Sequence, residues 1–296
     1  MPSLAKTGGI AEPRGLNYHP GLVGRWSARF CLLLLVLLST AGGVLGQEPP
    51  EAATDRGTAS TAAPPVPPAR EERPISWKLL VPNIVHDQKP IWLFPTQVAR
   101  GKHVKPTLGF VLATAGLVAL DPHDTPYFRR TDAFHDFNRV LSGKNTALGT
   151  AIFPLSFYAV GWARKDSYAQ QTALLAGEAV ADVQILTLVM KNIDRRLRPA
   201  DIPVDGDYTH TWFRSHGRVI TGRGSFPSGH TMGAFAIATV FAERYRRHRW
   251  VPWVAYGLAG LVGFSRVSLQ SHFPSDVFAG AVLGYTISHY VVLRRP

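Results

Sequence analysis

Three short patterns, far apart in the chain, hold the residue types that can do chemistry together. They are Lys-x6-Arg-Pro, Pro-Ser-Gly-His and Ser-Arg-x5-His-x3-Asp, and they comprise Lys191, Arg198, Pro199, Pro227, Ser228, Gly229, His230, Ser265, Arg266, His272 and Asp276. Guanidinium groups present forked donors that match phosphate oxygens. Imidazoles supply a nucleophile and an acid or base. The residue types therefore predict a site for a tetrahedral oxyanion with acid–base groups beside it.

Each of these residues also has an ordinary structural interpretation. A basic residue such as Lys191 or Arg198 at a helix C-terminus complements the helix dipole. A Pro-Ser-Gly run at a helix start is capping chemistry, and Asp276 in a first turn is a favourable charge there. His272 alone is more often a packing or surface histidine. The catalytic interpretation therefore depends on all of these residues meeting in one place.

The elements that must position them are helices, because no stretch shows the alternation of a strand. Helices are expected near 107–120, 147–163, 169–192, 228–245, 250–266 and 275–293. The fold class is accordingly all-α, a six-helix antiparallel bundle, since short connections at 164–168 and 246–249 make neighbouring helices antiparallel. The end of the third helix, the start of the fourth, the end of the fifth and the start of the sixth then share one end of the bundle.

Two further segments are expected to be irregular. Trp77 to Val98 contains Pro82, Pro90 and Pro95 and is expected to wrap around the bundle without regular structure. The region 193–227 is long and basic, and long loops in compact domains are usually functional. Substrate specificity is expected in the 121–146 and 200–226 loops, where Trp212 and Phe213 can meet an apolar chain, whereas His210 and His216 are expected to be ordinary loop residues.

The eleven positions resemble the three-part signature of the type 2 phosphatidic acid phosphatase and vanadium haloperoxidase superfamily, within its bacterial acid or lipid phosphatase branch. The resemblance covers roughly residues 107–293. It implies a helical bundle, a phosphatase mechanism without a metal or other cofactor, and a phosphate pocket that vanadate can also occupy.

The resemblance also implies a role for each site residue. His272 attacks phosphorus and forms a phosphohistidine, Asp276 holds the His272 ring, and His230 protonates the leaving group and then activates water. The groups that neutralise the phosphate oxygens are Lys191, Arg198, Ser228, the Gly229 N–H and Arg266. We therefore expect a phosphatase that hydrolyses a phosphomonoester or pyrophosphate, with a lipid phosphate as the favoured substrate.

The resemblance leaves other functions open. A vanadate-dependent haloperoxidase uses the same pocket, a non-specific soluble acid phosphatase uses the same chemistry, and a binder with a decayed site keeps the same fold. The substrate also stays open among phosphatidate, phosphatidylglycerol phosphate, undecaprenyl pyrophosphate, a lipid A phosphate and a soluble phosphomonoester. No protein partner can be inferred.

Composition excludes several classes of protein. Of the 296 residues, 46% are hydrophobic and 18% are charged, which excludes a disordered chain and a coiled coil. The single cysteine excludes an internal disulfide and a cysteine-based zinc site. The net charge of +12 comes without any nucleic-acid-binding module, so a nucleic acid partner is not expected.

The chain is expected to contain three segments. Residues 1–46, basic and then apolar, resemble a signal peptide or an N-terminal anchor. Residues 47–73 form a linker rich in proline and alanine, and residues 74–296 form the helical phosphatase domain.

The expected location is a bacterial cell envelope, with the site on the periplasmic side. Basic residues crowd the opposite end of the bundle, which the positive-inside tendency would place in the cytoplasm. Both an integral membrane protein and a soluble periplasmic protein fit, because the run 107–120 is short for a span. Glu178 and Asp182 must face the protein interior if their helix lies in lipid.

Overall fold

The computed structural model describes residues 73–293, and no strand occurs in that part of the chain. The helices are α2 (Trp77–Ala99), α3 (Val104–Arg130), α4 (His135–Val140), α5 (Gly143–Ala163), α6 (Ser167–Asp194), α7 (Gly229–Arg244), α8 (Trp250–Ser268) and α9 (Pro274–Ile287), with a short π-helical continuation at Ser288–Val292. Single 3₁₀ turns occur at Pro199–Asp201 and Val219–Thr221. The predicted all-α class is confirmed.

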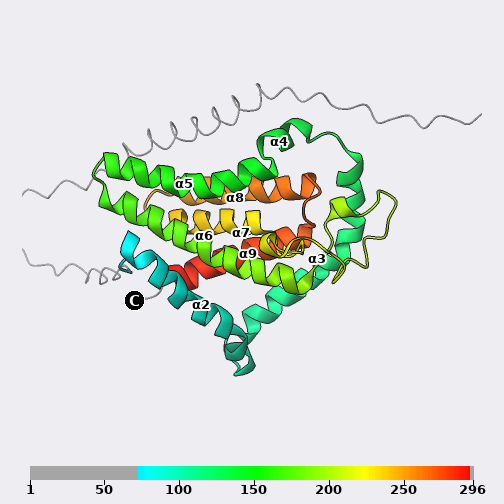
Figure 1. The fold of residues 1–296 in the computed structure, drawn as a ribbon, viewed down its shortest axis with the longest axis horizontal. Helices are drawn as coiled ribbons and strands as arrows, with labels where there is room; N and C mark the ends of the chain where they lie inside the picture. Colours follow the sequence, from blue (N-terminus) through cyan, green and yellow to red (C-terminus); the bar gives the residue numbers. More distant parts are fainter. Residues whose placement is uncertain (1–72, 294–296) are drawn as a thin grey trace, which may run out of the picture.

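Helix α7 is the centre of the bundle and packs against α6, α8 and α9. Its buried face carries small and apolar side chains such as Met232, Ala236 and Val240, each 0% exposed. The hydroxyl of Tyr168, at the start of α6, donates to the carbonyl of Arg244, at the end of α7, so these two helices are antiparallel. Figure 1 shows α5 to α9 side by side, with the α6–α7 connection at one end.

The structure contains more helices than the six expected, because α2 and α4 are helical. The prediction of an irregular segment at Trp77–Val98 is wrong: the chain forms a 23-residue helix with Pro82, Pro90 and Pro95 inside it. Proline removes a backbone donor and weakens a helix. Contacts of one face of α2 with α6 compensate for that weakness, among them the hydrogen bond from Asn83 to Glu178.

Most of the expected 121–146 loop is also helical. Helix α3 continues through Pro122 and Pro126 to Arg130, and α4 and the start of α5 occupy the rest of that range except for the short connections between the helices. The extension of α3 is held by tertiary contacts, since the buried Asp121 accepts hydrogen bonds from Ser275 and Arg196. Local sequence contains no sign of those contacts.

The surface of the bundle has the length and composition expected of membrane-spanning helices. Three helical segments, Val104–Arg130, Gly143–Ala163 and Ser167–Asp201, are long and apolar enough to cross a membrane by length and composition. The expectation that the first of them is too short is wrong, because the helix has 27 residues rather than 14. Large apolar side chains face outward, such as Leu112 (62% exposed), Leu155 (57%) and Trp253 (83%), as expected of helices that face lipid.

The predicted leader at 1–46 and almost all of the predicted linker at 47–73 lie outside the described residues. Arg73 is the exception, and it belongs to the folded domain: its side chain is only 7% exposed and pairs with Asp87 and Glu178.

Candidate active site

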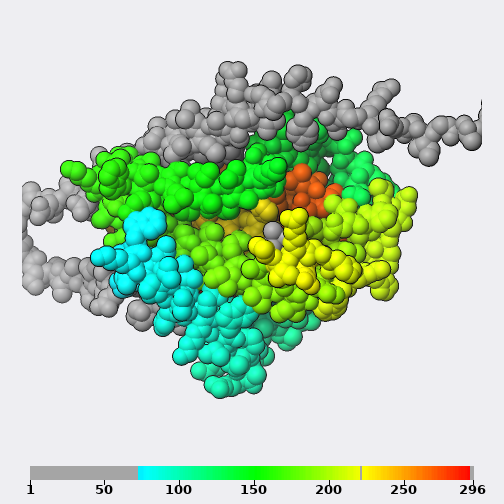
Figure 2. All heavy atoms as spheres, in the orientation of Figure 1, coloured from blue at the N-terminus to red at the C-terminus, as the bar shows by residue number. Residues whose placement is uncertain are grey.

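The starts and ends of four helices bring the three sequence patterns together at one end of the bundle. The Ser228 N–H, just before α7, donates to the carbonyl of Asp276 in the first turn of α9 (3.0 Å). Arg266 near the end of α8 reaches the start of α5, where Gly143 also contacts His230. Figure 2 shows the residues between α6 and α7, in yellow-green and yellow, over this end of the molecule. The predicted convergence of helix ends is present.

His272, in the connection between α8 and α9, is buried (1% exposed) and oriented by two neighbours. Its Nδ1 lies 3.5 Å from Asp276 Oδ2 and 3.3 Å from Ser225 Oγ. The Ser225 hydroxyl donates to the same carboxylate oxygen (2.5 Å), and the Phe273 N–H donates to it as well (2.9 Å). Ser225 therefore contacts both the imidazole and the carboxylate, and a proton held on Nδ1 leaves Nε2 of His272 as the basic nitrogen.

Arg196 anchors the other oxygen of Asp276. It is 1% exposed and donates from Nη1 to Asp276 Oδ1 (2.6 Å) and from Nη2 to Asp121 Oδ2 (2.6 Å). Its guanidinium lies between two rings, 4.1 Å from the centroid of Phe273 and 4.6 Å from that of Trp212. Because a guanidinium offers several donors in a fixed plane, Arg196 can hold two carboxylates from different helices at once.

Arg266 presents a buried donor that no group of the described residues satisfies. It is 0% exposed, and its Nη2 donates to the Leu141 carbonyl and to the hydroxyls of Thr146 (3.1 Å) and Ser265 (2.8 Å). Its Nη1 has no hydrogen-bond partner among residues 73–293. Buried polar groups are normally paired, so a free guanidinium N–H indicates a position for an acceptor such as an anion oxygen.

His230, the second residue of α7, lies beside the same cations. Its Nε2 is 3.1 Å from the Gly143 carbonyl, which can only accept, so Nε2 carries a proton and donates it to that oxygen. Arg266, Lys191 and Arg198 are close enough to act electrostatically on the imidazole. Burial and the charges of these three cations lower the pKa of His230 to about 4, so its imidazole is neutral at neutral pH unless a bound anion offsets those charges.

The first turn of α7 is open toward this site. The N–H of Met232 makes the first bond inside the helix, to the Ser228 carbonyl, so the N–H groups of the three residues before it are outside that ladder. Gly229 lets α7 approach α6 closely: a Cβ there would lie 3.0 Å from Thr187 Cγ2 and 3.9 Å from Lys191 Nζ. The Ser228 hydroxyl pairs with that of Thr231 (2.8 Å) and does not cap the helix.

Lys191 and Arg198 complete the set of cations. Lys191 is buried near the end of α6, and Arg198 is partly buried in the following connection. Burial and the charges of these two residues lower the pKa of His272 to about 3, although Asp276 acts in the opposite direction. His272 is therefore neutral at neutral pH, which is the state that a nucleophile requires. The structure brings all eight predicted site residues together; their roles stay predictions.

The residues expected to contact an apolar chain behave differently from each other. Phe213 is 64% exposed, but Trp212 is partly buried against Arg196 and Phe226, so it packs beneath the site. His210 is exposed and pairs with Asp207 in the same loop (2.7 Å).

Sequence reasoning missed Ser225, Arg196, Asp121 and Ser275 as members of the site. Arg196 was visible only as one of several basic residues after α6. The sequence holds one signal for two of them, which is their closeness to the predicted patterns. Arg196 lies between Lys191 and Arg198, and Ser225 lies two residues before Pro227. Which arginine of that stretch points inward depends on partners from α3 and α9.

The fold and the site define a helical membrane protein with an imidazole and several cations at one end of its bundle. Residues 172–296 match the family model described as the PAP2 superfamily, and they include all eleven positions of the three patterns. In this part of the chain, which begins within α6 and holds all three patterns, the protein is similar to the PAP2 superfamily.

Similar curated proteins are lipid phosphatases by name. A lipid A 4'-phosphatase from Porphyromonas gingivalis is 29% identical over 40% of this chain and 48% of the relative. A lipid A 1-phosphatase from the same organism is 39% identical over 28% of this chain and 18% of the relative. The undecaprenyl-diphosphatase BcrC of Bacillus subtilis is 41% identical over 24% of this chain and 38% of the relative. The chain thus spans about half or less of the length of these relatives.

Among solved structures, the chain is similar to a transmembrane PAP2-type phosphatidylglycerolphosphate phosphatase from Bacillus subtilis. The two are 26% identical, with a TM-score of 0.40, and the match covers 69% of this chain and 94% of the other.

Proposed function

We propose that the chain is a phosphatase that hydrolyses a lipid phosphate, a monoester or a pyrophosphate, through a phosphohistidine on His272 and without a metal in the reaction. One observation carries this proposal: a buried imidazole, neutral and held through Nδ1, shares its end of the bundle with an unpartnered guanidinium N–H of Arg266. A nucleophile next to unfilled anion donors is the arrangement that phosphoryl transfer needs.

The first step forms a bond between Nε2 of His272 and phosphorus and breaks the bond from phosphorus to the leaving oxygen. The leaving oxygen takes its proton from His230. Asp276, held by Arg196 and Ser225, keeps the His272 ring in position and stabilises its positive charge. The cations Lys191, Arg198 and Arg266 neutralise the charge on the non-bridging oxygens.

In the second step water attacks phosphorus and the bond to His272 breaks. His230, now neutral, removes a proton from that water, and inorganic phosphate leaves. Both steps balance with water as the only co-reactant. Vanadate is expected to bind in the same place, because it presents the same tetrahedral oxygens before it adds a fifth ligand.

The lipid nature of the substrate is supported by the apolar outer surface of the bundle and by the substrates in the names of the relatives. We further propose that the site faces the periplasm. The ends of the bundle opposite the site carry Arg164 and Lys165 between α5 and α6, and Arg246, Arg247 and Arg249 between α7 and α8. Basic connections of this kind favour the cytoplasmic side.

The test measures phosphate release by the purified full chain in detergent from lipid A, undecaprenyl pyrophosphate, phosphatidylglycerol phosphate, phosphatidate and a water-soluble phosphomonoester. His272→Ala is expected to abolish turnover and the acid-labile phosphoenzyme that labelled substrate forms, while the loop variant His216→Ala keeps both. Turnover by His272→Ala close to that of the wild type would contradict the mechanism. Activity on the soluble ester alone would contradict the lipid substrate.

A further inference from the structure

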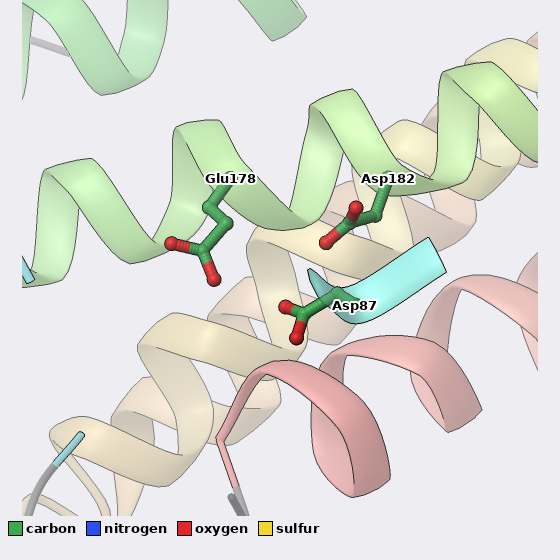
Figure 3. A group of neighbouring side chains, drawn as sticks. All are labelled: Asp87, Glu178 and Asp182. Atoms are coloured by element: carbon green, nitrogen blue, oxygen red, sulfur yellow. The ribbon is translucent and has the colours of Figure 1, made fainter. Parts of the chain in front are cut away.

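A second polar cluster lies between α2 and α6, away from the site described above. Asp87 of α2 and Glu178 and Asp182 of α6 are each 0% exposed, and one oxygen from each lies within 4.8 Å of the others. Figure 3 shows the three carboxylates pointing into the space between the two helices. Asp182 precedes Lys191 by nine positions, about 14 Å along a helix, so the two sites are separate.

One cation and two neutral amides of the described residues contact this cluster. The guanidinium of Arg73 pairs with Asp87 (2.7 Å) and with Glu178 (2.9 Å). The neutral amides of Asn83 and Gln88 donate to Glu178 (3.2 Å) and Asp182 (2.8 Å). Within residues 73–293, Arg73 thus pairs with two of the three carboxylates and no ion pair reaches Asp182, although a buried charge without compensation is costly.

An independent observation at Asp182 points to a ligand. Its Oδ1 accepts from Gln88, but its Oδ2 has no hydrogen-bond partner in the part of the chain that the structure describes, although the side chain is fully buried. Figure 3 shows this carboxylate directed toward Asp87. Arg73 contacts the two other acids, so among the described residues it is Asp182 that has no ion pair with a cation.

The chemistry of the donors selects the ion. Three carboxylates offer only oxygen, the ligand of hard divalent cations, with no nitrogen or sulfur for zinc or copper. Ca²⁺ binds oxygens at about 2.3–2.6 Å in a flexible geometry, whereas Mg²⁺ requires a near-ideal octahedron at about 2.0–2.1 Å. Three carboxylate oxygens within 4.8 Å of one another therefore suit the longer and more flexible coordination of Ca²⁺ better.

We propose that Asp87, Glu178 and Asp182 bind one Ca²⁺ ion, which fastens α2 to α6. The ion has a structural role and takes no part in hydrolysis. It holds a helix that three internal prolines weaken and that packs mainly against α6. It also fixes the place where the chain enters the bundle, because Arg73 binds the same carboxylates.

The test uses the purified full chain in detergent, stripped with a chelator and then titrated with Ca²⁺ or Mg²⁺. The wild type is expected to bind about one Ca²⁺ per chain by calorimetry, more tightly than Mg²⁺, and to show a saturable rise in its melting temperature. Asp182→Asn is expected to lose the rise and to weaken binding about tenfold or more. The matched control Asp136→Asn, at a carboxylate that is 86% exposed, keeps both.

Asp182→Asn removes a buried carboxylate that accepts only from the neutral amide of Gln88 among the described residues, so without Ca²⁺ this variant is expected to be at least as stable as the stripped wild type and to remain measurable. Glu178→Gln is expected to weaken Ca²⁺ binding in the same way. A folded wild type without any response to millimolar Ca²⁺ would overturn the proposal, since the carboxylates would then hold protons instead. An unchanged response in Asp182→Asn would overturn it equally.

Discussion

Replacing Arg196 with methionine tests whether the buried ion network holds Asp276 in place. The side chain donates four hydrogen bonds, to Thr211, Ser275, Asp276 and Asp121. Methionine fills much of the space but leaves the carboxylates of Asp121 and Asp276, each 0% exposed, without their cation. Removing one partner of a buried ion pair costs about 3–5 kcal/mol. At about 2–4 °C per kcal/mol, the melting temperature should fall by roughly 6–20 °C.

The assay compares thermal unfolding and steady-state hydrolysis for three variants. Arg139→Met removes an exposed arginine (55% exposed) and should change stability by no more than about 0.5 kcal/mol. Arg196→Met should lower kcat about 10–100-fold with little change in KM, because Arg196 touches Asp276 and not the substrate. Adding Asp121→Asn to Arg196→Met removes one of the two unpaired buried carboxylates, so the melting temperature should partly recover while kcat stays low.

Two results would refute this reasoning. If Arg196→Met melts within 1–2 °C of the wild type, the network contributes little to stability, contrary to the cost of a stranded buried charge. If the double variant regains full kcat, the loss in Arg196→Met came from destabilisation and not from the position of Asp276.

Three further outcomes are expected. Asp276→Asn should lower kcat about 10⁴-fold, because an amide favours the wrong tautomer of His272; a near-normal rate in a folded variant would contradict this role. Phosphohistidine formation should keep most of its pH 7 rate at pH 5, because burial and nearby cations lower the pKa of His272 to about 3 and keep the ring neutral. With an ordinary pKa of 6.5, the rate of phosphohistidine formation would instead fall about 30-fold between pH 7 and pH 5. Rapid-quench rates, corrected for substrate ionisation, that fall with a midpoint between pH 6 and 7 would therefore refute the lowered pKa of His272. Gly280→Ala should destabilise the protein by about 1–3 kcal/mol, because the new Cβ would lie 2.7 Å from the Ser228 carbonyl oxygen; Gly177→Ala, where nothing lies within 4 Å, is the control in thermal unfolding, and equal melting temperatures would speak against close α7–α9 packing.

The meeting of the three sequence patterns at one end of the bundle could be predicted from the chain alone, because it depends on the order of the helices. Short connections force neighbouring helices to run antiparallel, so motifs at alternate helix ends must meet. That reasoning placed Lys191, His230, Arg266 and His272 at one end, where the structure has them. The all-α class could also be predicted from the sequence, because its long apolar stretches lack the alternation of strands.

Only tertiary structure decided which polar residues are buried together. Arg196 is one of several arginines after α6, and it points inward because Asp121 and Asp276, distant in sequence, accept from it. Helix α2 exists despite its prolines because its polar face pairs with Glu178 and Asp182 of α6. Local propensity describes one segment at a time, whereas the free energy of a buried charge depends on partners that only the folded chain brings near.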